Sequence, residues 1–287
     1  MPLPSNAIAF VVAAASAAYF YPLALDLLRS HLQSLTTYLP SFHQPFQPQP
    51  YTCPNHTYTT QLISLDPLLI YISSFITPAE AASLISLGTP LLTASPITGS
   101  GSDVSDSNAR TSSSAPLPVD DEVVSCVLAR AEAFLGPAVL KTGRDDMGSP
   151  QMVRYTAGQR FDVHADWFSR PRLDPRDAER GKRRLYNRAA TIFVVLENNS
   201  TSGGETWFPR VNVPEPSSGG DHQPQAYRPD PQGGLAFPPQ AGNALFWPNL
   251  HPNGTGDARV VHAGLPIADG VKHGMNIWPR AFFGPDA

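Results

Sequence analysis

A stretch in the first half of the chain repeats apolar residues at the spacing of a helix that is buried on one side. Residues 77–88 read TPAEAASLISLG. Thr77 can cap this helix, Pro78 occupies its first position, and Glu80 completes a capping box. Gly88 can end it. The pattern therefore predicts a short helix.

A second stretch with the same period follows at residues 120–136, DDEVVSCVLARAEAFLG. Acidic residues stand at its start, where the helix dipole favours them, and Gly136 stands at its end. Its apolar stripe consists of Val123, Val124, Val127, Leu128, Ala131, Phe134 and Leu135. We expect this stripe to cover the face of a sheet.

Beyond residue 150 the pattern changes to short runs rich in β-branched and aromatic residues. The runs are QMVRY, ATIFVVLE, ETWFP, NALFW, RVVHAG and GMNIWPRAFF. Two long inserts interrupt them, a charged one at 170–188 and a Pro/Gly-rich one at 211–240. Residues 95–118, rich in Ser, Gly and Pro, predict a surface loop. Helices followed by strands indicate an α+β fold.

The N-terminal end differs from the rest of the chain. Residues 7–28 are almost entirely apolar, over a length close to that of a bilayer-spanning helix. Residues 1–28 therefore predict a signal anchor or a cleaved signal peptide, and an apolar helix packed on the domain is the alternative. A Pro-rich linker at 29–60 and one folded domain at 61–287 follow. Sequons for N-glycosylation occur at Asn55, Asn198, Asn199 and Asn253. We expect a glycoprotein of the endoplasmic reticulum membrane with its folded domain in the lumen, or a secreted one.

Composition narrows the class of protein. The 287 residues, 41% of them hydrophobic, suit one well-packed domain, and 31 prolines with 21 glycines favour a β-rich chain with long connections. A net charge of −4 gives no attraction to nucleic acid. The two cysteines, Cys53 and Cys126, can form one disulfide or remain free thiols.

Candidate chemistry begins at His164 and Asp166, in the stretch RYTAGQRFDVHADWF. Residues two apart on a strand face the same side, so both side chains can point at one ion. Such a pair alone is also typical of an ordinary turn or a buried histidine. His262 ends a later β-type run and supplies a third ligand, and Lys272 follows ten positions after it. Two histidines and one carboxylate form the triad that holds non-haem Fe(II) and leaves coordination positions open.

Five separated motifs between about residues 60 and 283 resemble the prolyl 4-hydroxylase branch of the Fe(II)/2-oxoglutarate-dependent dioxygenases. They are NARTSS, YTAGQRFDVHAD, RAATIFVVLENNSTSGGETWFP, AGNALFW, and the distal histidine followed by a lysine and Trp278. The resemblance implies a double-stranded β-helix (jelly roll, cupin-like) with supporting helices on one face. It also implies Fe(II) as metal, 2-oxoglutarate and O2 as co-substrates, and ascorbate as reductant.

Carried over by position, the resemblance makes His164, Asp166 and His262 the metal ligands. It makes these three residues, together with Lys272, the catalytic residues. Lys272 is similar to the cation that pairs with the far carboxylate of 2-oxoglutarate, and a buried dicarboxylate needs such a countercharge. Further partners of that co-substrate are Tyr155, Thr206 and, more weakly, Thr191.

Two positions depart from the family pattern. His273 stands where the family often has tryptophan, and Asn243 replaces the usual acid before an apolar strand. We expect both positions to shape the pocket and not the metal site. His262 also lies farther from His164 than in a compact member, and the two inserts account for the extra length.

The expected reaction is hydroxylation of an unactivated C–H bond, with release of succinate and CO2. Peptidyl proline is the leading substrate. The alternatives are the same chemistry on a free amino acid or secondary metabolite, and a cupin-like binding module without catalysis. The charged insert at 170–188 predicts either a solvated loop or a lid over the substrate. We expect Trp167, Phe168, Trp207 and Trp247 to be core or pocket wall.

Overall fold

The computed structural model describes residues 51–95, 109–174, 177, 179, 181–212, 226–284 and 286–287. Tyr51–Ala287 forms one compact unit. Among the described residues, no helix is both long and apolar enough to cross a membrane. The apolar stretch 7–28 and the linker as far as residue 50 lie outside the described part, so their roles stay predictions.

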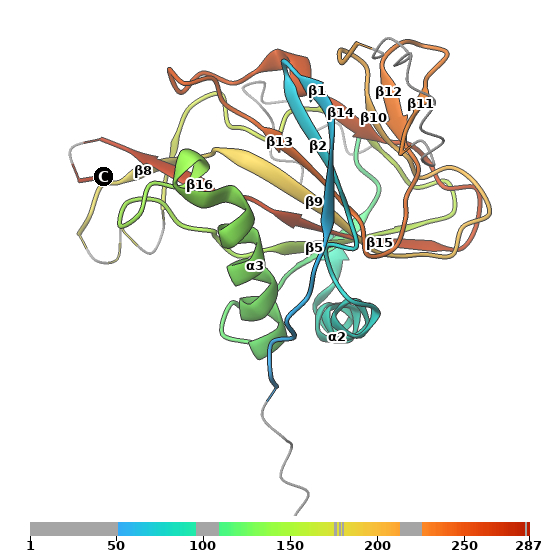
Figure 1. Ribbon diagram of the computed structural model, residues 1–287, viewed down its shortest axis with the longest axis horizontal. Helices are drawn as coiled ribbons and strands as arrows, with labels where there is room; N and C mark the ends of the chain where they lie inside the picture. The colour runs from blue at the N-terminus through green and yellow to red at the C-terminus, as the bar shows by residue number, and fades with distance from the viewer. Residues whose placement is uncertain are drawn as a thin grey trace, which may run out of the picture. The chain divides into compact units, whose positions relative to one another are not determined.

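Three antiparallel β-sheets contain most of the regular secondary structure of the described chain (Figure 1). The largest has the spatial order β1 (Thr59–Leu65), β2 (Leu68–Ser73), β13 (Ala244–Pro248), β9 (Ala190–Asn198), β15 (Val271–Ile277), β5 (Gln151–Thr156), β4 (Ser113–Pro116), β3 (Thr93–Ala94). The second has the order β11 (Arg228–Pro229), β12 (Leu235–Phe237), β10 (Thr206–Phe208), β14 (His262–Gly264), β6 (Phe161–His164). The third, called the ribbon below, has the order β16 (Arg280–Phe283), β8 (Leu185–Arg188), β7 (Arg172–Leu173). Short 3-10 helices occur at η1 (Thr89–Leu91) and η2 (Ala258–Val260).

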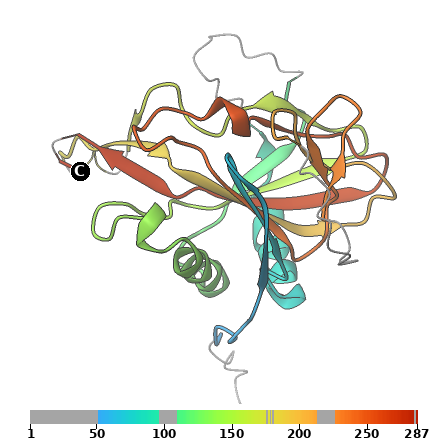
Figure 2. The ribbon, with the colours of Figure 1, turned by 45° about the horizontal axis from the view of Figure 1, so that its top comes forward.

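The central strands of the largest sheet are buried on both faces, which explains their nearly continuous apolar sequence. On β9, Phe193 and Val195 belong to the apolar layer between the two larger sheets. Ile192 and Val194 alternate with them and belong to the layer on the opposite face. Two sheets packed around one apolar layer are consistent with a jelly roll, and the described chain is mostly β with few helices (Figure 2).

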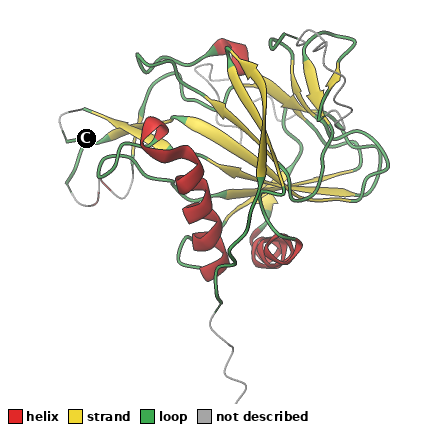
Figure 3. Cartoon of the chain, viewed as in Figure 1, coloured by secondary structure: helices red, strands yellow, loops and turns green. Residues whose placement is uncertain are grey.

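Two helices cover the outer face of the largest sheet (Figure 3). Helix α2 (Pro78–Gly88) has the predicted capping box, in which the Thr77 hydroxyl accepts from the Glu80 backbone N–H and the Glu80 carboxylate accepts from the Thr77 backbone N–H. All seven apolar residues predicted to form the stripe of helix α3 (Glu122–Val139) pack in the outer apolar layer. Gly136, with a φ of 58°, interrupts α3 at the predicted end. Both helix predictions are confirmed.

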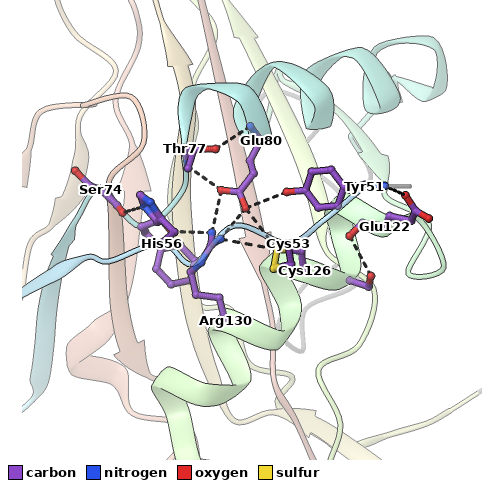
Figure 4. A network of polar contacts seen from close by, with 11 residues as sticks. Tyr51, Cys53, His56, Ser74, Thr77, Glu80, Glu122, Cys126 and Arg130 are labelled. Atoms are coloured by element: carbon purple, nitrogen blue, oxygen red, sulfur yellow. Dashed lines mark hydrogen bonds and ion pairs between the residues drawn. A yellow bond between two sulfur atoms is a disulfide. The ribbon is translucent and has the colours of Figure 1, made fainter. Parts of the chain in front are cut away.

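A network at the start of the unit ties the segment before β1 to the helices (Figure 4). Cys53 and Cys126 form a disulfide, which resolves the alternative that the sequence left open. Beside it, the buried carboxylate of Glu80 accepts hydrogen bonds from Arg130 at 2.7 and 3.0 Å. Burial alone would raise the pKa of Glu80, but these bonds and the one from the Thr77 backbone outweigh burial and hold it below its usual value. We call Cys53, Cys126, Glu80, Arg130 and Thr77 the clamp network.

Two expectations about the elements were wrong. Strands β1 and β2 precede the first helix, so the order is not helices followed by strands. Residues 95–118, expected to be a surface loop, contain β4, which pairs with β5. Serines hide this strand in the sequence, because its position depends on the hydrogen bonds of a neighbouring strand and not on its own apolar pattern.

Candidate metal centre and co-substrate pocket

The pairing of two strands brings the distal histidine to the HxD motif. His164 is the last residue of β6, and Asp166 follows two positions later. His262 is the first residue of β14, and in the antiparallel pairing of β14 with β6 it lies opposite His164. Directly opposed residues in a sheet project from the same face, so the strand register itself converges the two imidazoles.

The geometry of the three side chains fits a metal ion. One ligand atom from each of His164, Asp166 and His262 lies within 4.8 Å of the others. The Nε2 atoms of His164 and His262 lie 3.8 and 3.7 Å from the Asp166 carboxylate oxygens. Each Nδ1 lies near a backbone carbonyl, Asp162 O at 2.8 Å and Val260 O at 3.1 Å. Because a carbonyl only accepts, Nδ1 carries the proton and Nε2 presents its lone pair. This donor set is that of the non-haem Fe(II) triad.

Electrostatics keeps the ligands in metal-binding protonation states. Burial, followed by the neighbouring His262, lowers the pKa of His164 to about 3, so this imidazole is neutral over the working pH range. Burial would raise the pKa of Asp166, but His262, His164 and Arg188, together with a hydrogen bond from Thr191, leave it below its usual value. The centre therefore offers a carboxylate and a neutral imidazole.

Thr191 holds the metal ligand Asp166 in place through a hydrogen bond. Its hydroxyl donates to Asp166 Oδ2 at 2.7 Å and accepts from the side-chain amide of Asn249 at 2.9 Å. Both Thr191 and Asn249 are fully buried, and Thr191 does not line the cavity described next. The structure therefore places Thr191 at the metal ligand, and not at the co-substrate partner position that the sequence predicted more weakly. Asn249 was not predicted at all.

A cavity of about 300 Å³ opens in front of the triad. Tyr155, Thr206 and Lys272, the other predicted partners of the co-substrate, all line it. Lys272 is buried, and its Nζ donates to the backbone carbonyl of Gly204. Burial lowers the pKa of Lys272 to about 8. In the described part of the chain Lys272 has no carboxylate within ion-pair distance; Glu205 favours its charged form from farther away and itself binds Arg228 at 2.8 Å. A buried cation in this arrangement can pair with an anionic ligand.

The same cavity is lined by residues that the sequence analysis left without a role. Arg188, at the end of β8, lines it together with Trp278, and its guanidinium lies 3.3 Å from the centre of the Trp278 ring. Burial lowers the pKa of Arg188 to about 10. Arg110 lines the cavity too, with its guanidinium 4.5 Å from the centre of the Phe161 ring. Both arginines belong to quoted motifs, which is the signal that could have identified them.

Other predicted positions have different outcomes. His273 and Asn243 were expected to shape the pocket, but neither lines the cavity in front of the triad. Neighbouring residues on β15 face opposite sides, so Lys272 enters the cavity while His273 binds Glu197 at 2.9 Å outside it. Asn243 binds Tyr71 and the Ser74 backbone.

Three of the four aromatic residues expected to be core or wall pack in the interior, whereas the half-buried Trp207 belongs to neither apolar layer and does not line the cavity in front of the triad. Trp247 is buried beside His262, with ring centres 4.7 Å apart, and Phe168 is buried as well. Trp167 packs at the edge of the layer between the sheets, and Trp207 donates to the Gly233 carbonyl.

Comparison with known proteins identifies the class. Residues 150–280 match the family model of the 2OG-Fe(II) oxygenase superfamily. Probable prolyl 4-hydroxylase 6 from Arabidopsis thaliana is 30% identical over 225 residues, covering 77% of this chain and 72% of that protein. Probable prolyl 4-hydroxylase 4 from the same organism is 29% identical over 218 residues, covering 75% and 68%. The chain belongs to the 2OG-Fe(II) oxygenase superfamily, in its prolyl 4-hydroxylase-like branch.

A solved structure supports the fold. The viral collagen prolyl hydroxylase of Paramecium Bursaria Chlorella virus-1, in complex with 2OG, aligns with a TM-score of 0.50 at 21% identity. The alignment covers 80% of this chain and 99% of that one. The family makes the protein a dioxygenase that uses Fe(II), 2-oxoglutarate and O2, and it excludes a binding module without catalysis.

Proposed function

We propose that the protein is a prolyl 4-hydroxylase that acts on proline within a peptide. The single observation that supports the co-substrate chemistry best is the buried Lys272, which lines the same cavity as the triad and has no ion-pair partner in the described part of the chain. One dicarboxylate molecule can then bind the metal at one end and Lys272 at the other.

The residues would divide the work as follows. His164, Asp166 and His262 would hold Fe(II), which supplies the oxidising chemistry that couples decarboxylation of 2-oxoglutarate to hydroxylation of a C–H bond. Lys272 would neutralise the far carboxylate, with the hydroxyls of Tyr155 and Thr206 as hydrogen-bonding partners. The buried walls keep water away, which strengthens these electrostatic contacts.

Proline as substrate is supported by two observations. The relatives named above are prolyl 4-hydroxylases. Arg188 and Trp278, whose guanidinium and ring centre lie 3.3 Å apart, both line the cavity that holds the triad, and an apolar pyrrolidine ring can pack against such a wall. The same chemistry on a free amino acid or secondary metabolite is the second candidate, and the experiment below separates the two.

We also propose that the domain works in the lumen of the endoplasmic reticulum, membrane-anchored, or outside the cell, with ascorbate as reductant. The disulfide between Cys53 and Cys126 supports an oxidising compartment. The sequon residues Asn55 and Asn253 are exposed, so both are accessible to glycosylation. The apolar stretch 7–28 is the proposed anchor.

The test incubates the full chain with Fe(II), 2-oxoglutarate, O2 and ascorbate against proline peptides and against a panel of free amino acids and small metabolites. Succinate release and a mass gain of one oxygen atom are measured. We expect hydroxylated peptide. The variant His262→Ala should abolish both signals, whereas His251→Ala, which alters a partly exposed histidine outside the cavity, should keep them. Oxygen gain only on a free metabolite would contradict the proposal and favour the second candidate.

A further inference from the structure

In the charged insert at 170–188, acidic and basic side chains differ in burial. Two of its three acids, Asp174 and Asp177, are buried. Asp174 binds Arg280 at 2.6 Å, and Asp177 binds Arg184 at 2.6 Å. Arg280 belongs to β16 of the ribbon and also binds Asp146 outside the ribbon, so this network holds the insert in place and disfavours a freely moving lid.

The basic residues of the same insert mostly face outward. Among its described residues, four exposed cations have no ion-pair partner in the described part of the chain, and Glu179 is the one exposed acid. These four, called the basic surface below, are Arg170, Arg172, Lys182 and Arg183. Two exposed acids lie in or beside this insert, Glu179 and Asp286, whose carboxylate accepts from the Arg183 backbone N–H. The four cations outnumber them, so the basic surface keeps an excess of positive charge although the whole chain is net negative at −4.

A stack of planar groups connects the basic surface to the cavity. Arg188 lines the cavity and lies 3.3 Å from the centre of the Trp278 ring and 5.0 Å from the centre of the Phe168 ring. Arg172 lies over the same Phe168 ring at 3.9 Å. Phe168 is buried and lies two residues after the metal ligand Asp166, so the stack is anchored to the metal centre. Arg172 is therefore linked through Phe168 to Arg188, which lines the cavity.

We propose that the basic surface selects peptides that carry acidic residues beside the target proline, with Arg172 as the contact nearest the cavity. This inference rests on the proposed function, because it names the class of peptide which that site accepts. A guanidinium stacked on an aromatic ring loses little side-chain entropy when it binds a carboxylate, since its plane is already fixed. An acidic flank also gains from electrostatic steering toward the cavity.

The experiment compares three proline peptides of equal length whose flanking residues are glutamates, glutamines or lysines. For the wild-type chain we expect kcat/KM on the glutamate peptide to exceed that on the lysine peptide by roughly tenfold, with the glutamine peptide between them. Added salt should reduce this ratio, because exposed charges are screened. Fluorescence anisotropy with labelled peptides measures the same ratio as binding affinities.

Charge reversal then assigns the effect to the surface. Arg172→Glu should bring the glutamate-to-lysine ratio to about one or below, and Lys182→Glu should lower it less. Arg210→Glu reverses an exposed charge outside the insert whose guanidinium, among the described residues, donates to the Ala258 carbonyl, so the ratio should stay at the wild-type value. Equal kcat/KM and equal affinity for all three peptides in the wild type, or a ratio unchanged by Arg172→Glu, would overturn the inference. If no peptide is hydroxylated, the proposed function fails, and the anisotropy ratios still decide whether the surface prefers acidic peptides.

Discussion

The clamp network and the metal centre each bury one carboxylate, but they satisfy it differently. Glu80, 2% exposed, receives two hydrogen bonds from Arg130 and one from the Thr77 backbone at 2.8 Å. Asp166, 4% exposed, receives one side-chain hydrogen bond, from Thr191, and faces two imidazoles at 3.7 and 3.8 Å, beyond hydrogen-bond length. A buried charge with a complete set of partners is structural, whereas one with an incomplete set marks a place where a ligand completes it.

The largest effect should come from removing the incompletely satisfied carboxylate. In Asp166→Ala we expect 2-oxoglutarate turnover to fall to background, because the metal loses its anionic ligand. The thermal unfolding midpoint of the metal-free protein should change little, because Asp166 serves the ligand more than the fold. Succinate assays and calorimetry measure the two. Asp120→Ala, at an exposed acid, should keep wild-type turnover.

In the clamp network we expect a substitution to lower the stability of the fold and to leave activity unchanged. Arg130→Met leaves the Glu80 charge buried without its cation and should lower the free energy of unfolding by about 3–5 kcal/mol. Denaturant unfolding measures this loss, and kcat/KM at low temperature should stay near wild type. Adding Glu80→Gln should restore part of the stability, since a neutral amide can still accept at the helix cap. A loss of kcat/KM at low temperature without a loss of unfolding free energy would contradict the division between the two regions.

Lys272→Met removes the buried cation that has no ion-pair partner. We expect KM for 2-oxoglutarate to rise on the order of a hundredfold, because the far carboxylate loses its buried countercharge. Without 2-oxoglutarate, the variant should unfold at a higher temperature than wild type, since an uncompensated charge has left the interior. A lower unfolding temperature would show that Lys272 stabilises the fold on its own.

Thr191→Val tests the residue that orients Asp166. We expect Fe(II) affinity to fall about tenfold to a hundredfold, the range typical of groups that position a metal ligand. Titration of the metal-free protein with Fe(II) or Co(II) under anaerobic conditions measures it directly. Thr201→Val, which removes an exposed hydroxyl bonded to Asp269, is the matched control and should leave metal affinity unchanged.

The smallest effect is a pH dependence. With a pKa of about 8, Lys272 is protonated below that pH and neutral above it. Binding of 2-oxoglutarate needs the charged form, so KM should be flat below pH 8 and rise above it, about tenfold by pH 9. Initial rates across this range measure KM, and the Lys272→Met variant should show no such rise. A wild-type KM that falls above pH 8 would reverse the assigned sign.

Much of this protein follows from sequence patterns that depend on neighbours along the chain. The capping box at Thr77 and Glu80, the apolar stripe of α3 and the runs that became β5, β9 and β13 were all predictable, because helical and strand periods are local properties. The HxD motif was local too. Its link to His262 and Lys272 rested on the place of His262 at the end of a β-type run, on the ten-residue interval to Lys272 and on the family resemblance.

Other features depend on contacts that only the folded chain makes. The register of β14 against β6 sets His262 opposite His164, and no local pattern encodes a pairing over such a separation. The roles of Thr191 and Asn249 and the pairing of Cys53 with Cys126 arise in the same way. The residues themselves determined which chemistry was available, while strand pairing and burial decided which charges meet, because both depend on segments far apart in the sequence.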